Sequence, residues 1–193
     1  MLKGNRPQRI AAVTGASSGI GRAFARRLAA EGYDLLLVTR RIERLESVAK
    51  EIRAKGNSHV EVLAADLADA EQRRLIEARL ASEPRLAMLV NSAGFGTAGP
   101  LSEISPERIE REIQLNAIAT ILLTHAALRA MIPQRSGAIL NVSSATGFQP
   151  NPHFATYGGT KAYLTNVSVA LSDGGRKAGI HVLAVCPGPV RPE

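Results

Sequence analysis

The stretch "TGASSGIG" (residues 14–21) decides the fold, because it joins a short apolar run to a helical pattern. The run "IAAVTG" (10–15) is typical of a buried strand, and residues 19–31 carry the periodicity of a helix. The glycines permit a sharp turn and a close approach of the backbone to a pyrophosphate, and the N-terminus of the helix attracts anions. The spacing G-x-x-x-G-x-G is not the general fingerprint G-x-G-x-x-G, yet its position between strand and helix favours a nucleotide-binding turn.

The same alternation of strand and helix continues along the chain. Short apolar runs are found at 10–15, 34–39, 60–65, 86–91, 137–142 and 180–185, and helical patterns at 19–31, 42–55, 69–82, 106–132 and 157–177. Such an alternation predicts an α/β fold, a doubly wound parallel sheet with helices on both faces. Ligands bind beyond the carboxyl ends of the strands, where the sequence places Gly15, Thr39, Arg40, Asp66, Asn91, Ser143, Ser144 and Pro187.

The composition is that of one soluble domain. The chain has 193 residues, of which 45% are hydrophobic, so that it can bury one sizeable core. Its single cysteine, Cys186, excludes an internal disulfide and fits a reducing compartment. The apolar stretch 117–132 is interrupted by His125 and Arg129 and is short for a membrane span. We therefore expect a cytoplasmic protein without a membrane partner.

The net charge of +7 leaves three kinds of partner open: nucleic acid, a membrane surface or an anionic small molecule. The arginines are scattered along helical segments, aromatic residues make up only 4%, and tryptophan is absent. This pattern favours a solvated, arginine-rich surface over nucleic-acid binding, which would appear as salt-dependent affinity for duplex DNA. Potential metal ligands nowhere have the spacing of a metal site, so we expect none.

The end of the second predicted strand, "VTRR" (38–41), bears on the choice of cofactor. A dinucleotide-binding sheet that uses NAD has an acidic residue about 20 residues beyond the glycine turn, where it binds ribose hydroxyls. This chain instead has Arg40 and Arg41, whose guanidinium groups suit the 2′-phosphate of NADP, and Thr39 offers a hydroxyl. The alternative is that the arginines simply begin a basic helix. The sequence favours NADP over NAD.

The stretch "TYGGTKAYL" (156–164) carries candidate catalytic chemistry. On a helix, Tyr157 and Lys161 lie one turn apart and share a face. A phenol is a poor proton donor at neutral pH, and a neighbouring ammonium group stabilises the phenolate, which suits the pair to general acid–base work. Ser144 ends the fifth strand, where its hydroxyl could hold a substrate oxygen. Without the glycine turn upstream, a surface tyrosine and lysine would be the simpler interpretation.

Together these stretches resemble the short-chain dehydrogenase/reductase family. The resemblance rests on "TGASSGIG", "ADL" (65–67), "NSAG" (91–94), Asn116 in "QLNAIA", "NVSS" (141–144), "YGGTK" (157–161) and "PGPV" (187–190), in the order of the family. It implies a single NAD(P)-binding domain over residues 1–193, with a Rossmann-type sheet in the strand order 3-2-1-4-5-6. It also implies an NADP-dependent oxidoreductase that interconverts a carbonyl and an alcohol in small-molecule substrates.

The resemblance assigns roles to individual residues. Tyr157 would be the general acid/base, Ser144 the ligand of the substrate oxygen and Lys161 the binder of the nicotinamide ribose, while Asn116 would support a water-linked proton relay. The cofactor-binding residues would be Gly15, Ser17, Ser18, Gly19, Ile20, Gly21, Thr39, Arg40, Arg41, Asp66, Leu67, Asn91, Ala93, Gly94, Tyr157, Lys161, Pro187, Gly188 and Val190. The stretches "FGTAGP" (95–100) and "GFQPNPHF" (147–154) resemble substrate-pocket loops.

Two features depart from the family pattern. The sequence ends shortly after "PGPV", with Pro192 where the family has a threonine, so we expect a longer functional protein that adds a lid and an edge strand. A non-catalytic NADP-binding or scaffolding protein is the alternative. Gly158 and Gly159 together cost a helix about 2 kcal/mol relative to alanine, and we expect them to allow the close approach of a neighbouring element.

The long helical pattern 106–132 also bears on assembly. Its apolar part, 117–132, exceeds what one helix face needs to cover a sheet. With the pattern 157–177 it predicts a homodimer or homotetramer through paired helices, as the family resemblance also implies. The alternative is that the apolar run is buried within the subunit.

Overall fold

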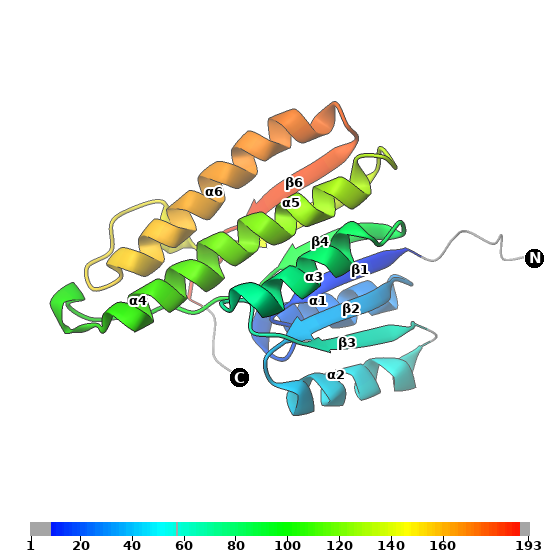
Figure 1. Ribbon diagram of the computed structural model, residues 1–193, viewed down its shortest axis with the longest axis horizontal. Coiled ribbons are helices and arrows are strands. Elements are labelled where there is room, and N and C mark those ends of the chain that lie inside the picture. Colours follow the sequence, from blue (N-terminus) through cyan, green and yellow to red (C-terminus); the bar gives the residue numbers. More distant parts are fainter. Residues whose placement is uncertain (1–8, 57, 190–193) are drawn as a thin grey trace, which may run out of the picture.

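The computed structural model describes residues 9–56 and 58–189 of the chain (Figure 1). Val190, predicted to contact the cofactor, lies outside these residues. The strands are β1 (Ile10–Thr14), β2 (Asp34–Thr39), β3 (Val60–Ala64), β4 (Leu86–Asn91), β5 (Gly137–Val142) and β6 (Ile180–Val185). The α-helices are α1 (Gly19–Ala30), α2 (Ile42–Lys55), α3 (Ala70–Ala81), α4 (Pro106–Ile113), α5 (Thr120–Met131) and α6 (Ala155–Arg176). The predicted bounds agree to within about two residues, the usual uncertainty of helix and strand ends.

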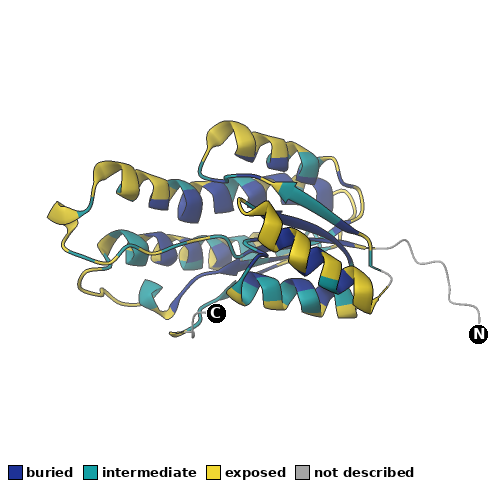
Figure 2. Cartoon of the chain, turned by 90° about the horizontal axis from the view of Figure 1, so that it is seen from below, coloured by how far each residue is buried: buried dark blue, intermediate teal, exposed yellow. Residues whose placement is uncertain are grey.

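The described strands form one parallel sheet in the order β3-β2-β1-β4-β5-β6, which confirms the predicted topology. One buried core joins the sheet to α1 and α2, and a second joins it to α3 and α5, with α6 on the same side (Figure 1). The inner faces of the helices are buried and their outer faces are exposed (Figure 2). The molecule is therefore a sheet between two helical layers.

The central strands show why the sequence lacks a strict alternation of apolar and polar residues. Leu35 and Leu37 of β2 pack into the core beneath α1 and α2, whereas Leu36 packs into the opposite core beneath α3 and α5. All three side chains are at most 1% exposed. A strand that is buried on both faces reads as a continuous apolar run.

The predicted helix 106–132 is one continuous helix, Pro106–Met131, made of α4, a π-helical segment (Gln114–Ala119) and α5. Its start is fixed by Ser105, whose side chain accepts a hydrogen bond from the backbone N–H of Arg108. By length and composition alone this helix could cross a membrane, but 56% of its apolar window is buried inside the protein, as in a core helix. The π-helical segment contains Asn116, and such segments occur frequently at functional sites.

The two glycines beside Tyr157 do not serve a close approach, contrary to our expectation. A Cβ atom at Gly158 would meet only ordinary contacts at 3.5 Å, and one at Gly159 would meet nothing within 4 Å. The tight contact with α6 is made instead by Gly147, where a Cβ would lie 2.8 Å from the backbone of Lys161. The local spacing of glycines in α6 could not show this, because the space around a residue depends on its tertiary neighbours.

Replacing Gly159 by alanine is therefore expected to stabilise the protein by about 0.5–1 kcal/mol, because alanine loses less backbone entropy in a helix and the added methyl group has open space. Urea denaturation of the two proteins measures this difference. Gly147→Ala is the matched control and should destabilise the protein, since its methyl group overlaps the backbone of α6. A loss of stability in Gly159→Ala would contradict the packing described here.

Candidate active site

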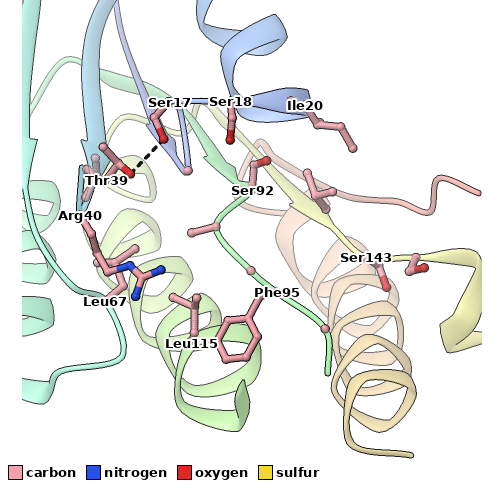
Figure 3. A pocket seen from close by; sticks show the side chains of 18 of the residues that line it. Ser17, Ser18, Ile20, Thr39, Arg40, Leu67, Ser92, Phe95, Leu115 and Ser143 are labelled. Carbon is pink, nitrogen blue, oxygen red and sulfur yellow. Dashed lines mark hydrogen bonds between the residues drawn. The ribbon is translucent and has the colours of Figure 1, made fainter. Parts of the chain in front are cut away.

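A cavity of about 350 Å³ opens at the edge of the sheet where the parallel strands end (Figure 3). Its lining combines the turn after β1, the ends of β2 and β3, the segment after β4, the end of β5 and the first turns of α6. Of the predicted site residues, the lining contains Gly15, Ser17, Ser18, Gly19, Ile20, Thr39, Arg40, Arg41, Asp66, Leu67, Ala93, Gly94, Ser144, Tyr157, Lys161, Pro187 and Gly188. Residues far apart in the sequence are thus brought to one site.

The glycine turn is held against the segment that follows β4. Gly15 has a φ of 66°, a conformation that favours glycine, and a Cβ there would lie 2.9 Å from the backbone of Ala93. The Thr14 hydroxyl accepts hydrogen bonds from the backbone N–H groups of Ser92 (3.0 Å) and Ala93 (3.1 Å). At Gly21, a Cβ would lie only 2.4 Å from the Gly15 carbonyl oxygen. The turn therefore requires glycine at both positions.

The end of β2 supplies polar and cationic groups. The Thr39 and Ser17 hydroxyls are 3.2 Å apart and hydrogen-bonded (Figure 3). The side chains of Arg40 and Arg41 are exposed, and neither forms an ion pair with the described residues, whereas many other arginines of the chain are paired with carboxylates. Arg40 points into the cavity on the side of Leu67 and Leu115 (Figure 3). Two unpaired guanidinium groups at the rim suit an anionic ligand.

The Asp66 carboxylate, just beyond the end of β3, forms an ion pair with the Arg111 guanidinium of α4. This contact crosses from the end of the sheet to the long helix, and sequence reasoning did not predict it. Asp66 also accepts a hydrogen bond from the backbone N–H of Ala68 at 3.1 Å, which fixes its position. The carboxylate is thereby held at the mouth of the cavity.

Tyr157 and Lys161 lie one helical turn apart on α6 and both face the cavity, as predicted. The Lys161 Nζ atom is 5.6 Å from the centre of the Tyr157 ring and donates a 2.7 Å hydrogen bond to the carbonyl oxygen of Val142. Lys161 is only 5% exposed. Burial lowers the pKa of Lys161 to about 8, and negative charge at Cys186 and Glu112 acts in the opposite direction.

The Tyr157 ring is held in place on two sides. A Cβ at Gly96 would lie 3.0–3.4 Å from three ring atoms of Tyr157, so that only the small side of a glycine fits against the ring. The Phe154 ring lies edge-on at 6.1 Å between centroids. Ser144 lines the same cavity, and its Oγ atom accepts a hydrogen bond from the backbone N–H of Thr146 at 3.2 Å. A tyrosine fixed in this way is preorganised to act on a bound group.

Asn116 lies behind the cavity wall and connects three elements. Its Oδ1 atom accepts from the Phe95 N–H (3.1 Å), and its Nδ2 atom donates to the Phe95 carbonyl (2.8 Å) and to the Thr160 hydroxyl (3.2 Å). A Cβ at Gly94 would lie 3.0 Å from Asn116 Oδ1 and 3.6 Å from Lys161 Nζ. Asn116 therefore holds the segment after β4 against α6, beside Lys161.

Some predicted residues do not contact the cavity directly. Gly21 acts within the turn, and Asn116 lies behind the wall. Asn91, 3% exposed, belongs to a buried network in which its Nδ2 atom donates to Thr124 Oγ1 (3.1 Å) and to Asn141 Oδ1 (2.9 Å). The expected lining role of Asn91 is thus corrected to one in the interior, because β4 directs this side chain between β5 and α5.

Sequence reasoning omitted several lining residues. Those added by the structure are Val38, Ala65, Ser92, Leu115 and Val142, while Ser143 was expected at this edge of the sheet and Phe95 and Gly96 belong to an expected substrate-pocket loop. Each of them is next to a predicted site residue or lies within one of the motifs quoted in the sequence analysis. Their closeness in sequence to the predicted residues could therefore have identified them. The loop "FGTAGP" contributes Phe95 and Gly96, whereas the loop 147–154 contributes none of the described lining residues.

Comparison with known proteins identifies the family. A family profile described as short chain dehydrogenase matches residues 9–193. The chain belongs to the short-chain dehydrogenase/reductase family. A solved member of the family, the short-chain dehydrogenase from Sphingobium yanoikuyae in complex with NADPH, superposes with a TM-score of 0.93 at 37% identity, covering 95% of this chain and 72% of that chain.

Two curated relatives agree with this assignment. A very-long-chain 3-oxoacyl-CoA reductase of Pyricularia oryzae is 35% identical over 178 residues, which are 89% of this chain but only 53% of the relative. An uncharacterized oxidoreductase of Staphylococcus epidermidis is 31% identical over 184 residues, which are 95% of this chain and 78% of the relative. The chain thus spans about half the length of the first relative and belongs to a family of oxidoreductases.

Proposed function

We propose that this protein is an NADP-dependent oxidoreductase that interconverts a carbonyl and an alcohol in a small molecule. The observation that carries the proposal is the shared cavity. Ser144, Tyr157 and Lys161 line the same space as the glycine turn and Arg40. A proton-transfer group and a dinucleotide-binding turn in one cavity are the two parts that such a reaction needs.

The residues at the edge of the sheet fit a dinucleotide. Gly15 and Gly21 leave no room for a Cβ atom, which keeps the backbone close to the space that a pyrophosphate would take. The N-terminus of α1 supplies N–H groups for phosphate oxygens. Arg40 and Arg41 would bind a 2′-phosphate, and Lys161 a nicotinamide ribose. When bound, the cofactor supplies the hydride to the carbonyl carbon or accepts it from the alcohol.

The protein's own residues would move the proton. In reduction, the Tyr157 hydroxyl donates its proton to the carbonyl oxygen while the Ser144 hydroxyl donates a hydrogen bond to the same atom. The Lys161 ammonium stabilises the phenolate that remains, and solvent returns the proton to Tyr157. In oxidation the same steps run in reverse. The substrate thus gains one hydride and one proton, which balances the conversion of a carbonyl to an alcohol.

The oxidation of NADPH by the purified full-length protein, followed by absorbance with a panel of aldehydes and ketones, tests this function. Carbonyl-dependent oxidation supports it. Binding of NADPH by calorimetry without turnover of any substrate would contradict it and favour a non-catalytic NADP-binding protein. The latter possibility has a relative in its support, the human protein named inactive hydroxysteroid dehydrogenase-like protein 1, which is 31% identical over 181 residues.

Replacement of Arg40 by aspartate is expected to weaken NADP binding about ten- to a hundredfold, because a charge-assisted contact with the 2′-phosphate is replaced by repulsion. NAD, which lacks this phosphate, should lose far less affinity. Calorimetric titration of both cofactors measures the two changes. Arg44→Asp on the following helix, outside the lining, is the control for the loss of net charge. Tighter binding of NAD than of NADP by the unchanged protein would contradict the role given to Arg40.

We also propose a homodimer or homotetramer through the long helix and α6. Five apolar side chains on these helices or directly after the long helix are at least 36% exposed, namely Ile113, Ile118, Ile132, Tyr163 and Val169. Such residues favour burial against a second copy. Light scattering at micromolar concentration should give at least twice the 20.5 kDa of the chain. A strict monomer would contradict the proposal.

A further inference from the structure

The burial pattern of α4 is the reverse of what an amphipathic helix normally shows. Glu112 is the buried residue of this helix, with 0% exposure, whereas its neighbour Ile113 is 40% exposed. Burying a carboxyl group in place of an isoleucine gives up apolar burial and costs solvation of the carboxyl group. A buried carboxyl group that carries such a cost at this position points to a functional role for Glu112.

Neither oxygen of the Glu112 side chain has a hydrogen-bond partner among the described residues. Buried polar side chains almost always have such a partner, so Glu112 is exceptional. Hydrogen bonding within the fold therefore does not explain why this carboxyl group lies in the interior. The burial of Glu112 must therefore be explained by an electrostatic interaction over a longer distance than a hydrogen bond.

The position of Glu112 places it beside the active site. It lies one helical turn before Asn116, whose side chain reaches Phe95 and Thr160, and α4 packs against α6. Burial lowers the pKa of Lys161, the buried cation of the cavity, and electrostatic interaction with Cys186 and then with Glu112 opposes this lowering. The Lys161 Nζ atom donates to the Val142 carbonyl oxygen and not to the carboxyl group, so the two groups interact through space and not by direct contact.

We propose that Glu112 is the buried counter-charge of Lys161, which keeps this side chain in its ammonium form beside Tyr157. Glu112 is thus a positioning residue that acts through Lys161 and touches neither substrate nor cofactor. An isolated ammonium in the interior loses its solvation and tends to give up its proton. A carboxylate in the same interior offsets that tendency, because charges interact strongly where water is excluded. The catalytic consequence of this inference rests on the function proposed above, but the charge interaction itself does not.

The titratable groups that face Lys161 are few. Tyr157 lies one turn earlier on its own helix, Cys186 follows β6, and Glu112 comes from α4, while the π-helical segment and β5 bring no titratable side chain to it. Of these, Glu112 carries the carboxyl group. Replacing the Glu112 carboxylate by a neutral group therefore removes one negative charge near Lys161 and leaves Tyr157 and Cys186 in place.

The protonation of Lys161 can be followed directly, because the chain contains only five lysines, Lys3, Lys50, Lys55, Lys161 and Lys177. NMR of protein carrying 13C- and 15N-labelled lysine gives the titration midpoint of each side chain, and Lys161→Arg assigns the signal. In the cofactor-free protein, Glu112→Gln should lower the midpoint of Lys161 by about one to two pH units, the shift expected from a unit charge at an effective dielectric constant of about 20. Glu110→Gln, an exposed carboxyl group on the same helix, should leave it unchanged.

A second variant, Glu112→Met, removes the charge with an apolar side chain and should lower the same midpoint. Both variants should lower the free energy of unfolding at a pH where Lys161 is protonated, because they leave the buried ammonium group without its counter-charge. An unchanged Lys161 midpoint in Glu112→Gln and Glu112→Met would overturn the inference, whatever the stability. If the midpoint falls but no carbonyl is reduced by the parent protein, the charge pair stands and the proposed function fails.

Discussion

Replacement of Tyr157 by phenylalanine is expected to lower kcat by about 10²- to 10⁴-fold, the usual contribution of a positioned general acid or base. The substitution removes the hydroxyl alone. The ring keeps its packing against Gly96 and its edge-on contact with Phe154, so the cavity retains its shape. The affinity for NADPH should therefore change little. Steady-state kinetics with a carbonyl substrate and calorimetry with NADPH separate the two effects.

Tyr163→Phe is the matched control for this experiment. Tyr163 lies on the same helix, is 41% exposed and does not line the cavity, so the loss of its hydroxyl should leave kcat unchanged. A Tyr157→Phe variant that reduces carbonyls at the rate of the parent protein would remove Tyr157 from the mechanism. The function would then need another proton donor within the cavity.

Replacement of Gly21 by alanine is expected to destabilise the protein by about 1–3 kcal/mol, the usual cost of overpacking. The added methyl group would lie 2.4 Å from the carbonyl oxygen and 2.8 Å from the carbonyl carbon of Gly15. Both atoms belong to the backbone, so the turn itself must move. Since this turn holds the space for a pyrophosphate, NADP affinity should fall at least about tenfold. Urea denaturation and calorimetry measure the two losses.

Gly188→Ala provides the comparison within the same cavity. Gly188 lines the cavity, but a Cβ there would meet nothing within 4 Å. This variant should retain its stability. If Gly21→Ala behaves in the same way as Gly188→Ala, the requirement for glycine in the turn is wrong.

The predicted strands and helices agree with the structure because the relevant signals are local. Apolar runs such as 34–39 predict strands buried on both faces, and the helical pattern 106–132 predicts the long helix that the structure has at Pro106–Met131. The parallel order followed from the alternation of these elements. The residues at the strand ends then had to meet at one edge of the sheet, which is why most of the predicted residues line one cavity.

The expectations for Asn91 and Gly159 failed because the answer depends on tertiary neighbours. Asn91 ends a strand like its neighbours at the site, but the structure directs its side chain into the interior, toward Asn141 and Thr124. Gly159 faces open space, although its sequence context suggested a close approach. Glu112 is buried where helical periodicity would place an apolar residue, and only the packing of α4 against α6 reveals its position. Sequence spacing alone does not report these environments.

The transfer of deuterium tests the central claim most directly. The purified protein is incubated with NADPH that carries deuterium at nicotinamide C4 and with a carbonyl that it consumes, and the alcohol is analysed by mass spectrometry. The account predicts one deuterium on the carbon of the former carbonyl group, with transfer lost in Tyr157→Phe and kept in Tyr163→Phe. A protein that binds NADPH in the cavity, but transfers no deuterium to any aldehyde or ketone, would contradict the assignment of this site as a carbonyl-reducing centre.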